Sequence, residues 1–412
     1  MVTKRQDVII VIRYNGGSVM PPKLFSLLIC ACLLFLYFTF VPRNPTLQKT
    51  LISHTPCDFS NGQWVYDPKL PNPLYNQSCP FHRNAWNCMR NKRPNMELLN
   101  SWKWVPDDCD LPWIDPLGFL SSMKNKNIGF VGDSLNENFL IAFLCILRVA
   151  DGGAKKWKKN GAWRGAFYPK FNVTVAYHRA VLLAKYEWKP EDSTADRAGR
   201  KGFYRVDVDM PAHEWASIGN RYDVLIFNTG HWWSHDKFPK TTPLVFYHAS
   251  RAIAPPLGLY DGLKVTLRNV VSHIEKEVPA STLKFWRLQS PRHFYRGDWN
   301  QNGSCLFSEP LKQHELDKWF DPKSDGVNKE SRQINDIIRQ IVSGTDIHLL
   351  DVSRLSEPRA EAHPAGWLGK KDAVAVWGQD CLHWCLPGVP DTWVHILSRQ
   401  ILISIKIDNV DR

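Results

Sequence analysis

The chain has 412 residues, of which 44% are hydrophobic and 22% are charged. This balance is typical of a folded protein and excludes an intrinsically disordered one, which needs fewer apolar and more charged residues. The formal net charge is +12 at pH 7, and such an excess of basic groups favours anionic partners.

The first predicted element is a membrane anchor. An uncharged apolar run extends from Leu24 to Val41, and basic residues precede it. A run of this length just spans a bilayer as a helix, and no small-residue cleavage site follows it. Positive charge on the short side keeps the N-terminus in the cytosol. We therefore predict a cytosolic tail over 1–23, a single transmembrane signal anchor over 24–41 and a stem over 42–56, with the remainder in the secretory lumen.

Cysteine usage agrees with a lumenal location. Disulfides form in oxidising compartments, and an even set of cysteines after the anchor is what a disulfide-bonded secretory protein has. A zinc site is not expected, because Cys381 and Cys385 have a permissible spacing but no second close pair completes four ligands. The candidates for disulfide bonding are Cys57, Cys79, Cys88, Cys109, Cys145, Cys305, Cys381 and Cys385.

Two surface features also belong to the lumenal part. Glycosylation sequons occur at Asn76, Asn172 and Asn302. The densest basic cluster surrounds Trp157, and it is either a binding site or a solvated loop. The compartment excludes nucleic acid as its partner. The cluster consists of Lys155, Lys156, Lys158 and Lys159.

The lumenal part is predicted to contain an irregular lobe followed by an α/β domain. Residues 57–126 are rich in Cys, Trp, Pro and Asn and lack sustained periodicity, which indicates a lobe tied by disulfides. Over 127–412 apolar strand candidates alternate with helical patterns, so we expect a three-layer α/β/α arrangement with a mostly parallel sheet, in one globular unit with the lobe. The strand candidates are 128–131, 222–227, 282–287 and 347–352, and the helical segments are 135–146 and 331–342.

The first candidate for chemistry is the tripeptide Gly132-Asp133-Ser134. It follows a predicted strand and opens a predicted helix, and active sites of parallel sheets gather beyond the carboxyl ends of their strands. A serine on this turn exposes its hydroxyl beside the free N–H groups of the helix, where an oxyanion would form. The alternative is an ordinary helix N-cap, for which Ser and Asp are also favoured.

The second candidate is the pair Asp380 and His383. A serine hydroxyl needs a base, and histidine titrates in the right range. A carboxylate on the other ring nitrogen fixes the tautomer and stabilises the imidazolium. Asp-x-x-His also occurs by chance in structural positions, so the pair gains weight only together with Ser134.

In this order, the two strings resemble the first and last blocks of the GDSL/SGNH esterase superfamily. The longer segments CDFSNGQWVYD, NSWKWVPDDCDLP, FVGDSLNEN, NTGHWW, SPRHFYRGDWNQNGSC and DCLHWCLPGVPDTW resemble the plant trichome birefringence-like family, also described as PC-esterases. The resemblance runs from Cys57 nearly to the C-terminus. It implies an SGNH-type domain with Ser134 as nucleophile, His383 as base and Asp380 as the residue that orients the histidine.

The resemblance also implies weaker assignments. The oxyanion hole and substrate contacts would come from the backbone N–H of Ser134 and from Gly132, Asp133, Asn228, Gly230 and His231. The chain departs from the family at Glu137, where members commonly have a more basic string. As a guess at the connectivity, Cys381 and Cys385 would bond to distant cysteines such as Cys305 and Cys88 and hold the histidine loop to the domain.

The expected function is that of a Golgi type II membrane protein that acetylates hydroxyls of a cell-wall polysaccharide. No metal or bound cofactor is expected, and the acetyl donor is either acetyl-CoA or an acetylated membrane partner. The acceptor stays open among xylan, xyloglucan, mannan and pectin. Two alternatives also stay open: an acetylesterase that uses the same triad, and a non-catalytic protein that binds wall glycans.

Overall fold

The computed structural model describes residues 57–191, 201–324, 328–369 and 378–410. The predicted tail, anchor and stem lie outside these residues. Within the described ranges, the structure contains no helix with the length and apolar character needed to cross a membrane. Asp58–Arg412 make one compact unit.

A sheet of seven described strands forms the centre of the unit, in the order β13-β12-β9-β3-β6-β5-β4. Strands β13 to β6 in this order are parallel, whereas β5 and β4 are antiparallel to their neighbours. The sheet is therefore mixed, because the links between β4, β5 and β6 are too short for crossover helices. The bounds are Asn127–Gly132 for β3, Lys155–Lys156 for β4, Arg164–Tyr168 for β5, Val173–Arg179 for β6, Val224–Phe227 for β9, Leu283–Arg287 for β12 and Ile347–Leu350 for β13.

Helices cover both faces of this sheet. On one face Phe130 of β3 packs edge-on against Phe139 of α4 (Ser134–Leu147), with ring centroids 5.4 Å apart. Phe139 in turn contacts Trp393 of α9 (Val389–Val410), and α3 (Pro116–Ser122) lies beside these two helices.

The other face of the sheet carries the next residue of β3. Val131 is buried in a cluster with residues of α5 (Leu259–Glu277) and α7 (Glu330–Val342). Successive residues of one strand thus pack into the cores on opposite faces of the sheet. Helices, sheet and helices therefore form the predicted three layers.

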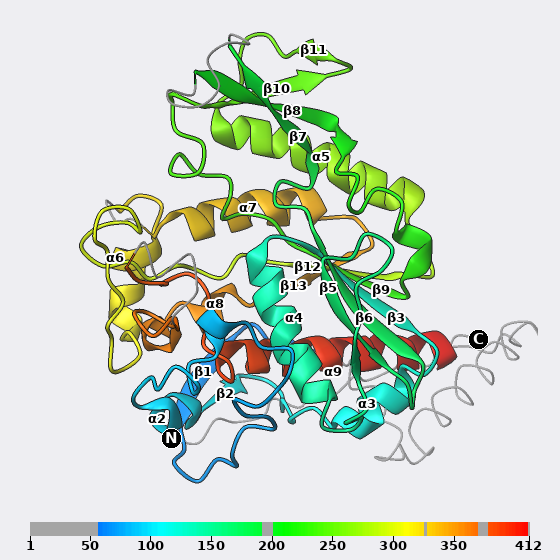
Figure 1. The fold of residues 1–412 in the computed structure, drawn as a ribbon, viewed down its shortest axis with the longest axis vertical. Coiled ribbons are helices and arrows are strands. Elements are labelled where there is room, and N and C mark those ends of the chain that lie inside the picture. Colours follow the sequence, from blue (N-terminus) through cyan, green and yellow to red (C-terminus); the bar gives the residue numbers. More distant parts are fainter. Residues whose placement is uncertain (1–56, 192–200, 325–327, 370–377, 411–412) are drawn as a thin grey trace, which may run out of the picture. The chain divides into compact units, whose positions relative to one another are not determined.

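A second sheet, which the sequence analysis did not predict, packs on α5. Its described strands have the order β11-β10-β8-β7, and Figure 1 shows them at the top of the view. Gly262 of α5 admits the ring of Phe246, because a Cβ at Gly262 would come within 2.0 Å of it. The bounds are Ala184–Pro190 for β7, Gly202–Pro211 for β8, Leu244–His248 for β10 and Arg251–Ala252 for β11.

The N-terminal lobe is more regular than predicted. It contains an antiparallel pair, β1 (Gly62–Tyr66) and β2 (Trp102–Pro106), and the short helix α2 (Met96–Asn100). Trp64 of β1 donates from its indole N–H to the carbonyl oxygen of Leu355 at 2.7 Å. Leu355 belongs to α8 (Ser353–Ser356), and a further short helix, α6, spans Leu316–Phe320. The lobe is thus joined to the C-terminal part of the domain.

Candidate active site

The turn from β3 into α4 presents Ser134. Gly132 has φ of 144°, and a Cβ there would lie 2.0 Å from Oδ1 of Asn228, so only glycine fits this position. Asp133 caps α4 by accepting a hydrogen bond from the N–H of Leu135 at 3.0 Å. The strand and helix thus meet at a sharp corner. Ser134 is the first residue of the helix, and its side chain is partly exposed.

The structure brings Ser134, His383 and Asp380 together. Nε2 of His383 lies 2.8 Å from Oγ of Ser134, and Nδ1 lies 2.9 Å from Oδ2 of Asp380. Oδ1 of Asp380 accepts the backbone N–H groups of Leu382 and His383 at 3.1 Å and 2.9 Å. The two oxygens of one carboxylate therefore hold both the loop and the imidazole.

Asp380 is fully ionised in this setting. Burial by itself would raise its pKa, but the electrostatic attraction of His383 and the hydrogen bonds from His383 and Leu382 outweigh burial and lower the pKa to about 2. The carboxylate therefore requires the imidazole proton to sit on Nδ1, which leaves the Nε2 lone pair free to accept the hydroxyl proton of Ser134.

Covalent and polar links fix the histidine loop on both sides. Disulfides join Cys305 to Cys381 and Cys88 to Cys385, and these pairs match the guess from the sequence. The amide of Asn138, one turn into α4, donates to the carbonyl of Trp384 at 3.2 Å and accepts its N–H at 2.9 Å.

The remaining candidate cysteines are bonded as well. Cys79 pairs with Cys145, and Cys57 and Cys109 are each disulfide-bonded. Cys79 belongs to the N-terminal lobe and Cys145 to α4, so this bond also joins the lobe to the helix that begins at Ser134.

The sequence analysis missed an aromatic residue of the N-terminal lobe that contacts the triad. Trp86 stacks on the ring of His383, with centroids 4.8 Å apart and an interplanar angle of 29°. The guanidinium carbon of Arg83 lies 4.9 Å from the centroid of the Trp86 ring. The lobe thus supplies one wall of the candidate site, and no local sequence signal indicates this.

Glu137, where the chain differs from the family pattern, is buried next to Arg83. It forms ion pairs with Arg83 at 3.2 Å and with Arg164 of β5 at 2.8 Å. Two guanidinium groups share one carboxylate, so this part of the site keeps a positive charge.

The side chain of Asn228 is held against Asp133, which uses one of its two amide N–H groups. Its Nδ2 donates to Oδ1 of Asp133 at 2.7 Å, and its Oδ1 accepts the N–H of Asp133 at 3.1 Å. Asn228 therefore braces the nucleophile turn. The N–H of Ser134 belongs to the first turn of α4, whose N–H groups have no acceptor within the helix, so it and the second amide N–H of Asn228 are both candidate oxyanion donors.

His231 is held as a neutral ring beside the triad. Its Nε2–H donates to the carbonyl of Ser290 at 3.0 Å, and its Nδ1 accepts from the amide of Gln289 at 2.9 Å. Burial lowers the pKa of His231 well below its ordinary value, and the charges of neighbouring groups such as Arg292 add to this. The neighbouring position 230 requires glycine, because a Cβ at Gly230 would come within 2.0 Å of Oε1 of Gln289.

The predicted glycosylation sequons lie on the surface. Asn76, Asn172 and Asn302 are exposed, as glycosylation requires, and their modification stays a prediction. Among the described residues, no group of three or more His, Cys, Asp or Glu side chains is arranged to hold a metal ion.

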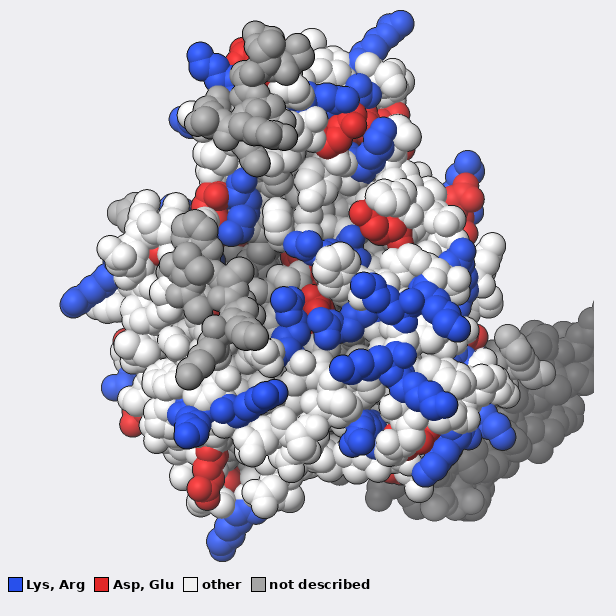
Figure 2. Space-filling view, viewed as in Figure 1, with Lys and Arg blue, Asp and Glu red and all other residues white. Residues whose placement is uncertain are grey.

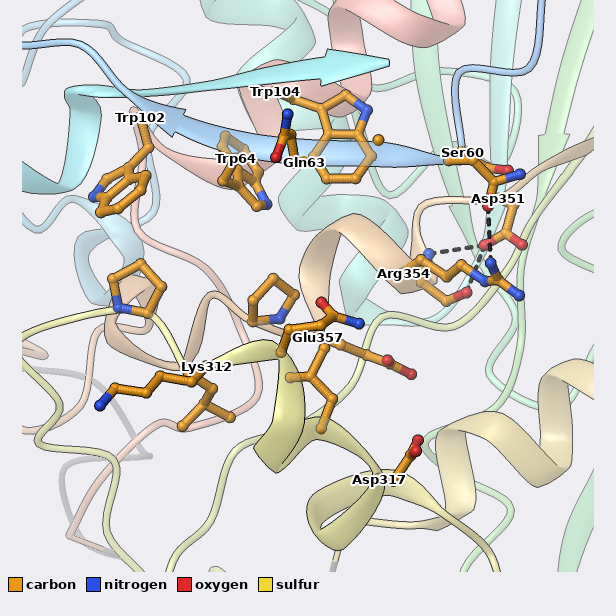
Figure 3. Close-up of a pocket in the computed structure, with 18 of the residues that line it drawn as sticks. Ser60, Gln63, Trp64, Trp102, Trp104, Lys312, Asp317, Asp351, Arg354 and Glu357 are labelled. Atoms are coloured by element: carbon orange, nitrogen blue, oxygen red, sulfur yellow. Dashed lines mark hydrogen bonds between the residues drawn. The ribbon is translucent and has the colours of Figure 1, made fainter. Parts of the chain in front are cut away.

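A separate cavity of about 1450 Å³ does not include the triad (Figure 3). Trp64 and Trp102 lie toward one side of this view, and Arg354 and Asp351 toward the other. Its charged groups are largely paired with one another: Arg332, for example, binds Glu357 at 2.8 Å and also pairs with Asp317. The candidate catalytic residues thus lie outside this cavity.

Comparisons with known proteins agree with the resemblance. Residues 111–400 match the PC-Esterase model, described as a GDSL/SGNH-like acyl-esterase family found in Pmr5 and Cas1p, and residues 55–110 match the PMR5 N-terminal domain. Protein trichome birefringence-like 12 of Arabidopsis thaliana is 64% identical over 89% of this chain and 90% of its own length. Protein trichome birefringence-like 13 of the same plant is 42% identical over 86% of each chain.

Proposed function

The chain belongs to the trichome birefringence-like family of PC-esterase proteins, and from this membership we propose that it is a serine-dependent O-acetyltransferase acting on a cell-wall polysaccharide. The observation that carries the proposal is the continuous chain from Oγ of Ser134 through His383 to Asp380, with steps of 2.8 Å and 2.9 Å. This arrangement suits nucleophilic acyl transfer.

In the first half-reaction, Nε2 of His383 takes the proton of Ser134 as Oγ attacks the acetyl carbonyl carbon of the donor. The carbonyl electron pair moves onto oxygen, and the N–H of Ser134 stabilises that oxyanion. When the intermediate collapses, the bond to the donor breaks and the imidazolium protonates the leaving group. Ser134 is left as an acetyl ester.

In the second half-reaction, a sugar hydroxyl takes the place of the donor. His383 accepts the hydroxyl proton as the sugar oxygen attacks the acetyl ester, and a second tetrahedral intermediate forms. Its collapse breaks the bond to Oγ, which regains its proton from His383. The products are an O-acetylated glycan and the free enzyme, so atoms and protons balance without a metal or a bound cofactor.

The location and the partners form part of the same proposal. We place the chain in the Golgi membrane as a single-pass type II protein, with the uncharged run 24–41 as its anchor and the triad in the lumen. The disulfides of the catalytic loop, Cys305–Cys381 and Cys88–Cys385, support an oxidising compartment. The donor is acetyl-CoA or an acetyl group supplied by a membrane partner.

A hydrolase is the second candidate, because the same triad passes acetyl to water if water reaches the acyl-enzyme. The stacked ring of Trp86 on His383 favours transfer, since an apolar wall on the general base limits the approach of water from that side. A non-catalytic glycan-binding protein would leave the aligned triad without a role.

The test is intact mass spectrometry of the purified protein incubated with an acetyl donor and a panel of deacetylated wall oligosaccharides. Ser134→Ala is the control. A gain of acetyl mass on an oligosaccharide, absent with Ser134→Ala, is the expected result. Loss of acetyl from pre-acetylated glycans without gain on any acceptor would replace the transferase by the esterase.

A further inference from the structure

Arg179 lies at the edge of the sheet from which Ser134 projects. It is the last residue of β6 and pairs in register with Gly132, the last residue of β3. The next residue, Ala180, donates its N–H to the carbonyl of Gly132 at 2.8 Å. Since the carboxyl ends of parallel strands meet at one edge, Arg179 is placed beside the nucleophile turn.

Two tryptophans flank this guanidinium. Its central carbon lies 5.7 Å from the ring centroid of Trp163 and 5.7 Å from that of Trp232. Trp163 precedes β5 and is 50% exposed, whereas Trp232 follows the turn after β9. Rings from two separate segments thus orient one cation and leave an aromatic surface open to solvent.

Arg179 also differs from its neighbours in charge pairing. Arg83 and Arg164 share Glu137, but among the residues that the structure describes no carboxylate lies within ion-pair distance of Arg179. An oriented guanidinium beside an active site, with open aromatic surface next to it, is suited to a planar anion bound by two parallel hydrogen bonds.

The lysines of the basic cluster around Trp157 extend the positive charge of Arg179 along the edge of the sheet. The ammonium of Lys158 lies 5.6 Å from the centroid of Trp163, and Lys155 and Lys156 are exposed on β4 at the sheet edge. Figure 2 shows Lys and Arg side chains gathered where Figure 1 has α4, β5 and β6. A small donor would need only one or two such cations. A polysaccharide with regularly repeated carboxylates instead matches a row of cationic side chains.

We propose that Arg179, Trp163 and Trp232 form an acceptor subsite for a uronic acid residue, and that Lys155, Lys156 and Lys158 hold further carboxylates of the same polysaccharide. The sugar ring stacks on tryptophan while its carboxylate binds the guanidinium. The inference rests on the proposed transferase function and narrows its acceptor to an acidic wall polysaccharide. Neutral glycans lack the group that this subsite binds.

The test compares two acceptors that differ only in charge: oligogalacturonides and the same oligosaccharides after reduction of their carboxyl groups. The full chain is assayed for acetyl transfer to each, beside Arg179→Gln. We expect Arg179→Gln to lower kcat/KM for the acidic acceptor about tenfold or more and to leave the reduced acceptor within about twofold. Arg221→Gln is the matched control, because Arg221 is exposed and donates only to the carbonyl of Asn160 in the described structure.

Binding measured on Ser134→Ala separates the subsite from the reaction. Calorimetry should show that the oligogalacturonide binds Ser134→Ala more tightly than its reduced form, and that adding Arg179→Gln reduces this difference in affinity while the lysines keep part of it. Equal binding of the two oligosaccharides would overturn the subsite, whether or not acetyl is transferred. A rise in the concentration of acetyl-CoA needed for half-maximal acylation in Arg179→Gln, with acceptor binding unchanged, would assign Arg179 to an anionic donor and also overturn it. Absence of transfer by the wild type to either acceptor, with selective binding intact, would count against the proposed function alone.

Discussion

Replacing Asp380 by Asn tests how the triad is oriented. Oδ1 of Asp380 accepts two backbone N–H groups, while Oδ2 faces Nδ1 of His383. The asparagine oxygen should keep the position with two donors, which places its NH₂ group against Nδ1. Nδ1 must then accept, so the ring proton moves to Nε2. That nitrogen faces Oγ of Ser134 and can no longer take its proton.

The size of the loss has two parts. The environment of Asp380 lowers its pKa from 3.8 to about 2, which corresponds to about 2 kcal/mol in favour of the carboxylate beside the imidazole. Removing that charge takes away its stabilisation of the imidazolium that forms during acylation. The wrong tautomer adds to this, so we expect acylation to slow by about 10³- to 10⁴-fold in total.

The assay is the rate of acyl-enzyme formation, followed by quenched-flow mass spectrometry with an activated acetyl ester. Asp391→Asn is a matched control, because Asp391 is a partly buried acidic residue that binds the N–H of Gly388 and the hydroxyl of Tyr75 and makes no contact with His383 in the described structure. Its acylation rate should equal that of the wild type. If Asp380→Asn acylates within about threefold of the wild type, the tautomer argument is wrong.

Three further predictions concern side chains around the triad. Trp86→Leu removes the ring stacked on His383, so the rate constant of acylation should fall about tenfold with the KM for the acetyl donor unchanged in stopped-flow assays; an unaltered rate constant would show that the ring does not position the base. Asn138→Ala leaves the buried N–H and carbonyl of Trp384 without their partners and should cost about 2–4 kcal/mol of unfolding free energy in urea titrations; an unshifted midpoint would exclude this role. Burial raises the pKa of Asp391 to about 7, so the folded state binds its proton more tightly and stability falls as pH rises from about 4 to 7. Between pH 5 and 7 the wild type should lose about 2 kcal/mol more than Asp391→Asn, and parallel pH profiles of the two would refute this.

The chemistry of the candidate site could be predicted from the sequence because it depends on local signals. An apolar run ending at Gly132 predicted β3, and the helical spacing after it predicted α4. Since both follow from short-range periodicity and turn chemistry, Ser134 could be placed at the end of a strand. The pairing of Asp380 with His383 followed from chemical need and from the resemblance.

The features that the sequence did not reveal depend on contacts between distant segments. Strands β7 and β8 are partly exposed on both faces, so they lack the alternation that marks a strand with one buried face. Arg179 reaches the nucleophile turn only through the register of β6 with β3. Trp86 reaches His383 through a lobe that the Cys88–Cys385 disulfide closes across 297 residues. Neither of these contacts between distant segments has a signature in the local sequence.

The most direct test of the central claim is to look for the acetyl group on Ser134. The protein is mixed with an acetyl donor in the absence of acceptor, quenched, digested and mapped by mass spectrometry, and a parallel sample is chased with oligosaccharide before quenching. We predict acetyl on the peptide that contains Ser134, and its transfer to the oligosaccharide during the chase. Transfer to glycan with no acetyl on Ser134 at any time, together with full activity of Ser134→Ala, would contradict the account.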